Sequence, residues 1–337
     1  MHRNPLKPAV VITTIQSPTP SIRKWLRTIN GRVIVVADCK TPPDWMLEGC
    51  DFLSVRMQQR MSFHLQRFLP WNHYCRKMIG YLVAMEQQTD IIIDTDDDNE
   101  PLHPYALLPQ EGMYWKTAEK SGFANVYRWF SDLWIWPRGF PLRHLVSSVF
   151  RYRWDVRKNN CRIGLWQGLV DGDPDVDAVY RMIVRREFRF HRREPLVLAK
   201  GTICPINSQN TIFFRDAFAL LYLPAFVSFR FTDILRGLVA QPVLWAADLL
   251  AGFTAPTAFQ LRNPHNLIQD FRSEIPCFLH AEKVCRIAVE TVRKQDGIAD
   301  NLHRVYEALL KHRIVRDPEL RLLDAWLEDY AKLAASV

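Results

Sequence analysis

The sequence predicts an α/β fold with a mainly parallel central sheet. Three features of the first hundred residues lead to this prediction: short apolar runs, stretches of helical spacing between them, and polar or acidic residues where the runs end. Strands that alternate with helices form parallel sheets with right-handed crossovers. The chain has 337 residues, which is long enough for one large domain or two smaller ones.

The expected elements follow one another in a regular order. The runs AVVITTI (9–15) and VIVVA (33–37) are continuously apolar, as expected of strands buried on both faces of a sheet. The helix between them ends at Asn30-Gly31, a helix-stop signal. The expected strands are 9–15, 33–37, 52–55 and 91–93, and the expected helices are 21–29 and 72–88.

The rest of the chain divides into two parts. Residues 100–280 are rich in Trp, Phe, Pro and Arg and contain no internal repeat. The last part is helical, because apolar side chains recur at helical spacing from Leu302 to Leu310 and again from Leu323 to Tyr330. We expect this tail to serve packing or oligomerisation, as in a homodimer.

The charge balance is basic. Lys and Arg number 44 against 36 Asp and Glu, so the formal net charge is +8, which attracts phosphates of nucleotides, nucleic acids, anionic lipids or glycans. The densest basic run is RMIVRREFRFHRR (181–193), for which a solvated basic face is the expected structure. A hydrophobic content of 48% excludes an intrinsically disordered chain.

Cysteine usage and hydropathy predict a cytoplasmic protein. The seven cysteines are widely spaced, odd in number and without a CxxC pair, which indicates reduced thiols and no zinc ribbon. The most apolar windows, 212–229 and 238–253, are interrupted by Arg215, Asp216 and Asp248, so no membrane span is expected. Peripheral contact with a membrane stays open.

Four aspartates follow the last apolar run, in IIIDTDDDNEP (91–101). Carboxylates so close together repel one another, and a hard divalent cation relieves that repulsion. Mg²⁺ and Mn²⁺ prefer oxygen ligands and usually take one or two protein carboxylates plus substrate phosphates. An Asp-x-Asp at a strand end therefore predicts a metal–diphosphate site, in which the metal would neutralise a leaving diphosphate. An acidic surface loop is the alternative.

Other polar residues are expected near this cluster. Thr13, Thr14 and Asp38 end two other strands, and ligands of open α/β sheets bind beyond the carboxyl ends of the strands. Arg76 and Lys77, on the helix before the fourth strand, are cations suited to phosphates, unless they form a solvent-facing pair. Gly80 would allow close packing or backbone approach.

Nine motifs follow one another over residues 9–275: VVITTIQSPT, VVADCKTPPDW, LPWNHYCRKMIGYLVA, DTDDDNEP, WPRGFPL, GDPDVDAVYR, NSQNT, FRFTDILRG and RNPHNLI. In this order they resemble the STELLO family of glycosyltransferases. More distantly, they are similar to the reversibly glycosylated polypeptides, which are UDP-arabinopyranose mutases. The resemblance implies a GT-A catalytic domain over 1–280, with a nucleotide-binding half at 8–100 and an acceptor half at 101–280, followed by a helical extension at 281–337.

The resemblance also implies roles for particular residues. Asp96 and Asp98 match the metal-binding DxD motif for Mn²⁺ or Mg²⁺, and His265 is a candidate third ligand. Asp38 matches the acidic residue that meets the base or ribose, and Asn207 belongs to a donor-site motif. Asp233 lies at the distance from the DxD at which inverting enzymes carry their general base, which favours inverting transfer. The alternative role for Asp233 is a structural ion pair with Arg230 or Arg236.

Two further segments are expected near the donor or acceptor. Trp136 and Arg138, in LWIWPRGF, are suited to stacking on a sugar or covering the donor, and ordinary packing is the alternative. The run DGDPDVD (171–177) borders the donor or acceptor site in the resembled families. It is not an EF-hand, because Val176 and Met182 stand where such a loop has Gly and Glu.

The predicted function is transfer of a sugar from a nucleotide-diphosphate donor, expected to be UDP-linked, to a glycan, lipid or protein acceptor. A nucleotide-sugar mutase or self-glycosylating enzyme is the first alternative, and a non-catalytic nucleotide-binding scaffold is the second. Nucleic-acid binding ranks last, because no known motif for it is present and the acidic cluster would repel phosphates without a metal.

Overall fold

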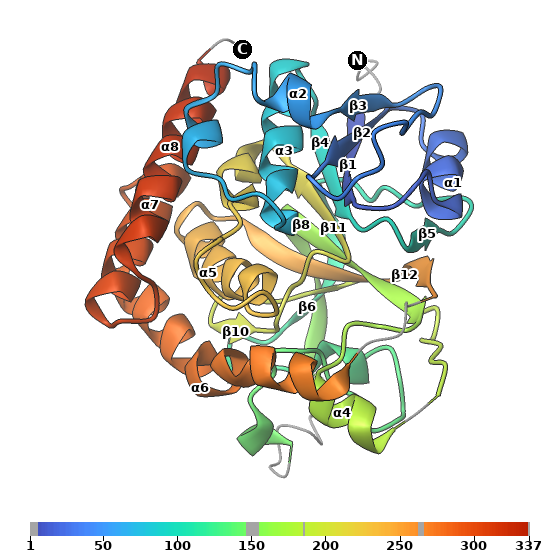
Figure 1. Ribbon diagram of the computed structural model, residues 1–337. Helices are drawn as coiled ribbons and strands as arrows, with labels where there is room; N and C mark the ends of the chain where they lie inside the picture. Colours follow the sequence, from blue (N-terminus) through green and yellow to red (C-terminus); the bar gives the residue numbers. More distant parts are fainter. Residues whose placement is uncertain (1–5, 146–154, 185, 262–265, 336–337) are drawn as a thin grey trace, which may run out of the picture.

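The computed structural model describes residues 6–145, 155–184, 186–261 and 266–335. A ten-stranded sheet forms its centre, in the order β3-β2-β1-β4-β11-β8-β6-β9-β12-β5, with helices packed around it (Figure 1). A separate pair, β7 and β10, forms a small second sheet. The fold is therefore mixed α/β with a large sheet core.

The strands are β1 (Pro8–Thr14), β2 (Arg32–Ala37), β3 (Asp51–Leu53), β4 (Ile91–Thr95), β5 (Asn99–Pro101), β6 (Glu111–Thr117), β7 (Gly122–Phe123), β8 (Val156–Gly172), β9 (Leu196–Val197), β10 (Thr202–Ile203), β11 (Asn210–Phe214) and β12 (Leu250–Gln260). The α-helices are α1 (Pro20–Thr28), α2 (Val55–Gln58), α3 (Lys77–Glu86), α4 (Ala178–Ile183), α5 (Thr232–Ala246), α6 (Leu267–Thr291), α7 (Ile298–Lys311) and α8 (Asp317–Ala334).

The first four strands of the sheet confirm the strands predicted in residues 1–100. They pair in parallel as β3-β2-β1-β4. Their side chains alternate between two hydrophobic clusters, so that Val11 and Val36 point to one face and Val10 and Val35 to the other. Both faces are covered, which is the reason that these strands are continuously apolar.

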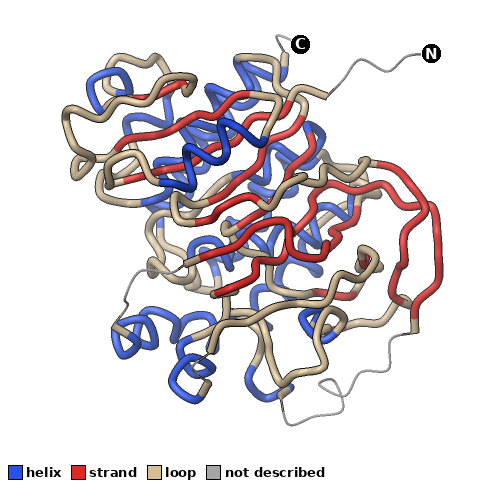
Figure 2. The backbone as a smooth tube through the Cα atoms, turned by 90° about the vertical axis from the view of Figure 1, so that its right-hand side faces the viewer, coloured by secondary structure: helices blue, strands red, loops and turns tan. Residues whose placement is uncertain are grey.

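The rest of the sheet is not mainly parallel. β11 lies antiparallel to both β4 and β8, and β6–β8 and β12–β5 are antiparallel as well, whereas β8–β12 and β6–β9 are parallel. The prediction of a mainly parallel sheet thus holds only for β3-β2-β1-β4. Figure 2 shows these strands as one twisted layer with helices on either side.

The helices of the C-terminal part confirm the predicted helical tail. The predicted boundary at residue 281 lies inside α6, which is continuous from Leu267 to Thr291. Side chains of α7 and α8 share a hydrophobic cluster with α3 and α5, and the buried Trp326 donates its Nε1–H to the carbonyl of Ala219 at 2.9 Å. These helices cover one face of the sheet (Figure 1).

The predictions about membrane spans and cysteines can be compared with the structure. Within the described ranges, no helix combines the length and the apolar character needed to cross a membrane. The seven cysteines are free thiols, five of them buried.

Candidate active site

A cavity of about 470 Å³ opens where β1, β2 and β4 end. β2 and β3 lie on one side of β1, and β4 lies on the other. The strand order therefore switches from one side of β1 to the other at this point. Ligands of open α/β sheets bind at such a switch point. The lining residues are Thr13, Thr14, Ile15, Gln16, Asp38, Lys40, Asn72, His73, Tyr74, Asp96, Asp97, Asp98, Arg138, Asp175, Ser208, Gln209, Phe229, Arg230, Asp233 and Gln260.

The first aspartate of the acidic cluster lies beneath this cavity. Asp94 is fully buried, and its carboxylate oxygens lie 2.9 Å from Lys77 Nζ and 2.8 Å from Arg236 Nη2. Lys77 is also fully buried and donates a second hydrogen bond, of 2.6 Å, to Asp96. Because buried ions are stable only when paired, Asp94 holds the ammonium group that supports Asp96 and is not free to bind a ligand.

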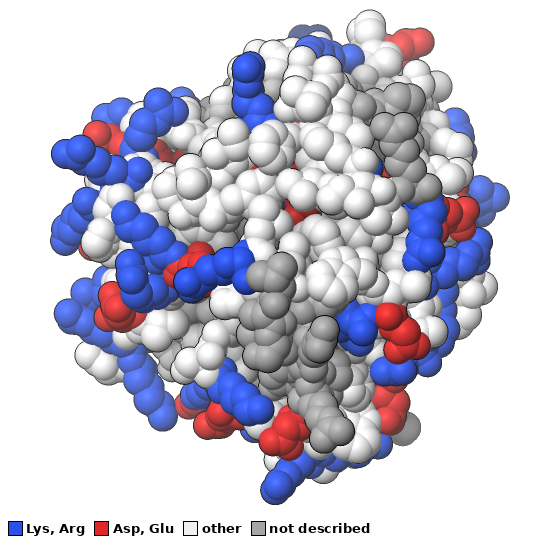
Figure 3. Space-filling model, turned by 90° about the horizontal axis from the view of Figure 1, so that it is seen from below, with Lys and Arg blue, Asp and Glu red and all other residues white. Residues whose placement is uncertain are grey.

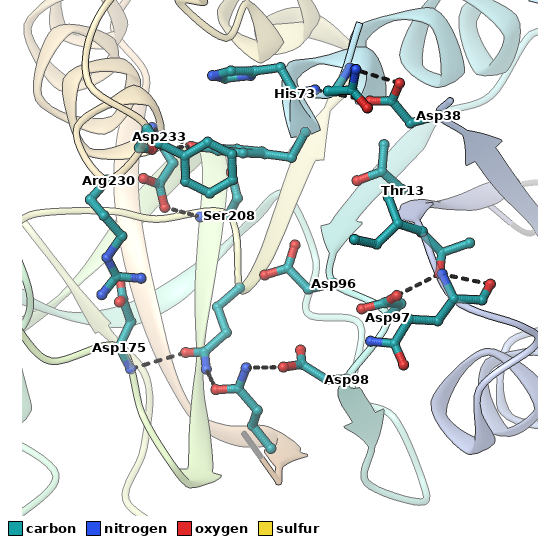
Figure 4. A pocket seen from close by; sticks show the side chains of 18 of the residues that line it. Thr13, Asp38, His73, Asp96, Asp97, Asp98, Asp175, Ser208, Arg230 and Asp233 are labelled. Carbon is teal, nitrogen blue, oxygen red and sulfur yellow. Dashed lines mark hydrogen bonds between the residues drawn. The ribbon is translucent and has the colours of Figure 1, made fainter. Parts of the chain in front are cut away.

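The other three aspartates of the cluster line the cavity (Figure 4). Asp97 accepts a 2.5 Å hydrogen bond from the Thr14 hydroxyl, and Asp98 accepts one of 2.8 Å from Gln260 Nε2. Burial raises the pKa of Asp96 to about 6; the Lys77 ammonium opposes this rise, and the charge of Asp98 adds to it. A cation bound beside Asp96 would lower this pKa.

Asp38 lines the cavity and also fixes the chain segment before α3. Its carboxylate accepts hydrogen bonds from the backbone amides of Cys39 (2.7 Å), Asn72 (2.8 Å) and His73 (2.9 Å). Asn72 has a φ of 57°, a left-handed conformation that asparagine tolerates better than most residues. The carboxylate therefore joins the end of β2 to the segment that carries His73 and Tyr74.

Three aromatic rings form one wall of the cavity. The ring centroids of His73 and Tyr74 lie 5.2 Å apart, and Phe229 lies 5.1 Å from His73 and 4.8 Å from Tyr74. Burial lowers the pKa of His73 to about 4, although Asp38 opposes the shift, so the imidazole is neutral at pH 7. Phe229 is 52% exposed and offers an apolar surface to a bound ring.

A buried charge cluster adjoins the aromatic wall, where the backbone amide of Asp233 donates to the Tyr74 hydroxyl at 3.1 Å. Arg138 donates two hydrogen bonds to Asp175, both of 2.9 Å, and two to Asp233, of 3.0 and 2.7 Å. Burial alone would raise the pKa of Asp233, but the Arg138 guanidinium outweighs it and lowers the pKa to about 2. A carboxylate with so low a pKa is a weak base, so this geometry favours Asp233 as the anchor of Arg138 over Asp233 as a general base.

A second arginine, Arg230, lines the cavity (Figure 4), and its backbone carbonyl accepts a hydrogen bond from Arg138 Nη1. Its Nε and Nη2 donate to one carboxylate oxygen of Glu274 at 3.0 and 2.7 Å. The other oxygen of the fully buried Glu274 accepts from the Ala178 amide at 2.7 Å. Glu274 thereby joins Arg230, α6 and the start of α4.

Two curated proteins of Arabidopsis thaliana resemble this chain over nearly its whole length. It is 26% identical over 346 residues to "Probable glycosyltransferase STELLO2" and 26% identical over 339 residues to "Probable glycosyltransferase STELLO1", in each case over 95% of this chain. The chain is related to the STELLO family. It spans 44% of the length of each of these proteins. No family model matches it.

The structure brings together most of the residues that the sequence predicts at the site. Thr13, Thr14, Asp38, Asp96, Asp98, Arg138 and Asp233 all line the cavity. Lys77 lies directly beneath it and reaches Asp96. His265 lies outside the described residues.

Two residues expected to contact the donor lie in the core below the cavity. Arg76 is fully buried, donates to Gln58, Gln66 and Leu69, and lies 3.5 Å from the ring centroid of Trp71. Gly80 packs α3 against the sheet, because a Cβ there would lie 2.5 Å from a methyl group of Val11. Neither residue reaches a ligand in the cavity.

Trp136 and Asn207 support the walls of the cavity from behind. Trp136 is buried and donates its Nε1–H to Asp177 at 2.6 Å, which caps α4. The Asn207 amide donates to Gln167 Oε1 at 3.0 Å, and the Asn207 side-chain oxygen accepts from the Gln209 amide at 2.9 Å. Both residues position neighbours of the site and do not line it.

The donor set of the cavity fits a divalent cation that shares its shell with a substrate. Over the described ranges, no group of three or more His, Cys, Asp and Glu side chains is arranged to hold a metal ion. Asp96 and Asp98 are two carboxylates at the same cavity, and Mg²⁺ is usually held by one or two carboxylates together with substrate phosphates and water. The site therefore suits a metal that arrives with a diphosphate.

Sequence reasoning did not assign several lining residues. Asp175 lies in the DGDPDVD run, which was placed near the site but without a role for any one aspartate. Arg230 belongs to the FRFTDILRG motif and was considered only as an ion-pair partner of Asp233. His73, Tyr74 and Phe229 lie in the motifs LPWNHYCRKMIGYLVA and FRFTDILRG but were given no role, because their wall forms only when segments far apart in sequence meet.

Proposed function

We propose that this chain is a metal-dependent glycosyltransferase of the GT-A type that uses a nucleotide-diphosphate sugar, with UDP as the expected nucleotide. The observation that carries the proposal is the presence of Asp96 and Asp98 together in a cavity at the switch point of the sheet. The names of the two Arabidopsis relatives support transfer of a sugar.

The charges of the cavity support the need for a cation. Six aspartates line it, whereas the lining cations are three, Lys40, Arg138 and Arg230, and Lys77 reaches Asp96 from beneath. Arg138 is already shared between two of these carboxylates. A diphosphate would meet repulsion here unless a cation entered with it. Mn²⁺ or Mg²⁺ at Asp96 and Asp98 would remove this repulsion and stabilise the charge of the leaving diphosphate.

Different residues of the site then have different roles in binding the donor. Lys77, fixed by Asp94, keeps the carboxylate of Asp96 directed to the cavity. The side of the cavity with Thr13, Thr14 and Asp38 takes the nucleoside, and the exposed ring of Phe229 offers a stacking surface for a sugar or base. On the other side Asp175 and Asp233 hold Arg138 in place, where its guanidinium orients hydroxyl or phosphate oxygens.

For an inverting reaction, the acceptor hydroxyl needs a proton acceptor. Asp233 is the residue of the expected motif, but its pairing with Arg138 favours a positioning role in the resting enzyme. The two roles differ in the pH dependence of the Asp233→Asn variant. Loss of a base removes the proton-acceptor limb of the profile, whereas loss of an anchor lowers the rate at every pH.

The proposal is tested by thermal unfolding with UDP, GDP, CDP and ADP, each with and without Mn²⁺. A ligand that binds only the folded state raises the melting temperature by mass action. We expect a rise for one nucleotide that requires Mn²⁺ and disappears in Asp96→Asn/Asp98→Asn. Asp44→Asn, at an exposed position away from the cavity, is the matched control.

A second measurement separates transfer from the alternatives. Incubation with the matching nucleotide sugar and Mn²⁺ should release the nucleoside diphosphate when an acceptor or water is available. Interconversion of the sugar ring without release would indicate a mutase instead. Binding without release or interconversion would indicate a scaffold, and no nucleotide-dependent shift at all would overturn the proposal.

A further inference from the structure

The lower side of the molecule in Figure 1 carries an exposed apolar stripe. Ile268, Phe271, Ile275 and Leu279 recur at helical spacing on α6 and are 68%, 37%, 39% and 67% exposed. Side chains with this spacing lie on one face of a helix. At the end of the neighbouring α4, Ile183 is 74% exposed. Contiguous exposed apolar side chains of this kind mark interaction surfaces.

Basic side chains flank this stripe. Arg272 and Arg286 occupy the same exposed face of α6, and the exposed Arg186 follows α4. None of these three arginines has an ion-pair partner among the residues that the structure describes. Arg186 belongs to the run 181–193, which has six arginines and one glutamate. Figure 3 shows this side of the molecule, where uncharged side chains lie between two groups of charged side chains that contain Lys and Arg together with Asp and Glu.

The α4 and α6 segments are held together, so the stripe and its arginines form one surface. Glu274, on the buried side of α6, accepts from the Ala178 amide at the start of α4 at 2.7 Å. The same glutamate binds Arg230 of the cavity. The surface is therefore part of the rigid structure next to the candidate active site.

We propose that this surface, defined by α4, the exposed face of α6 and Arg186, docks onto an anionic lipid bilayer. Helices with an apolar face and arginines beside it bury the apolar side chains at the headgroup boundary, while the arginines meet anionic headgroups. A second copy of the chain fits less well, because a two-fold interface would place these unpaired arginines against one another. A nucleic acid would leave the apolar stripe without a partner.

The test is co-sedimentation of the full chain with vesicles of phosphatidylcholine alone or mixed with phosphatidylserine, in the absence of nucleotide. We expect binding to the mixed vesicles only, weakening as salt is raised. Arg272→Gln/Arg286→Gln should lower the partition coefficient roughly fivefold for each arginine removed. Ile268→Ser/Leu279→Ser should lower it as well.

The matched control lies on α2 and in the turn that follows it, at the opposite end of the molecule in Figure 1. Arg56→Gln/Met57→Ser/Arg60→Gln removes similar exposed side chains there and should leave vesicle binding unchanged. All variants are checked for an unaltered melting temperature. Equal partition into both kinds of vesicle, or equal loss in the α2 control, would overturn the proposal. Self-association that the α6 variants abolish would overturn it too, and would assign the surface to a second copy. Because no nucleotide is present, none of these results depends on the proposed transferase activity.

Discussion

Replacement of Lys77 by methionine tests the central electrostatic feature of the site. Methionine keeps most of the length and apolar character of the side chain and removes the ammonium group. Lys77 is fully buried, and its ammonium lies 2.9 Å from Asp94 and 2.6 Å from Asp96. The variant therefore leaves two carboxylates without this partner, one of them fully buried.

The expected loss in the free energy of unfolding depends on the ion pair that Asp94 keeps in the variant. Removal of one partner of a buried ion pair costs about 3–5 kcal/mol. Arg236 still lies 2.8 Å from Asp94, which places Lys77→Met near the lower end, at about 3 kcal/mol. A chain of this size would then melt at least several degrees lower, at roughly 2 °C per kcal/mol.

The pH dependence adds an independent check. The carboxylates beside Lys77 raise the pKa of its ammonium against the effect of burial, so its stabilising charge is present throughout the acidic and neutral range. Lys77 in turn opposes the rise in the pKa of Asp96 to about 6. In Lys77→Met this pKa should rise further above 6. The loss of stability should therefore be largest above the raised pKa, shrink as the pH falls from that pKa towards 6, and stay constant below 6, where Asp96 is protonated in both proteins.

The assay is urea unfolding at several pH values, with Lys24→Met as the control. Lys24 forms an ion pair of 3.1 Å with Glu100 in which both side chains are more than one-third exposed, and such pairs contribute about 0–1 kcal/mol. If Lys77→Met cost no more than Lys24→Met, or if its cost were the same at every pH, the buried ammonium would not be supporting the acidic cluster.

Three further predictions concern the same region. Protons compete with a metal at Asp96, so the affinity for Mn²⁺ should be constant above its pKa of about 6 and fall up to tenfold per pH unit below it, as titration calorimetry would show; a flat profile would exclude Asp96 as a ligand. Asp233→Asn should lower the transfer rate without changing the shape of its pH profile, because Asp233 anchors Arg138; disappearance of the proton-acceptor limb would instead identify a base. Gly80→Ala should destabilise the protein by about 1–3 kcal/mol in urea unfolding, less the gain of up to about 1 kcal/mol from helix propensity, since the new methyl group would overlap Val11; a more stable variant would contradict this close packing.

The half of the site built on strand ends was predictable from sequence. Continuous apolar runs marked β1, β2 and β4, and parallel strands that follow one another have their carboxyl ends at one edge. Thr13, Asp38 and Asp96 were placed together on this basis, and the structure has all three in one cavity. For these three residues the local sequence pattern is sufficient to predict where the side chain lies.

The helix before β4 shows where local patterns are insufficient. The predicted helix began at Asn72, whereas the structure has a left-handed residue there, a 3₁₀ turn over Tyr74–Arg76 and an α-helix only from Lys77. This change of geometry turns Arg76 into the core and Lys77 towards Asp94. Two adjacent cations thus have different environments, which helical spacing alone does not distinguish.

The opposite wall of the cavity depends on contacts between distant segments. Arg138 meets Asp175 and Asp233, which are 37 and 95 positions away in sequence. A single sequence contains the aspartates but not the information that one arginine is shared between them. The pKa of Asp233 and its suitability as a base follow from that shared arginine, so the predicted role could not be judged before the fold was known.

The three amide hydrogen bonds to Asp38 bear on the thermodynamics of ligand binding. Two of them hold the backbone at Asn72 and His73 in place, including the left-handed conformation of Asn72, without help from a ligand. Ordering a free loop costs about 1–2 kcal/mol of conformational entropy for each residue, and this part of the cavity has already lost that freedom on folding. A ligand that stacks on His73 or Tyr74 would therefore bind without an entropic penalty from this segment.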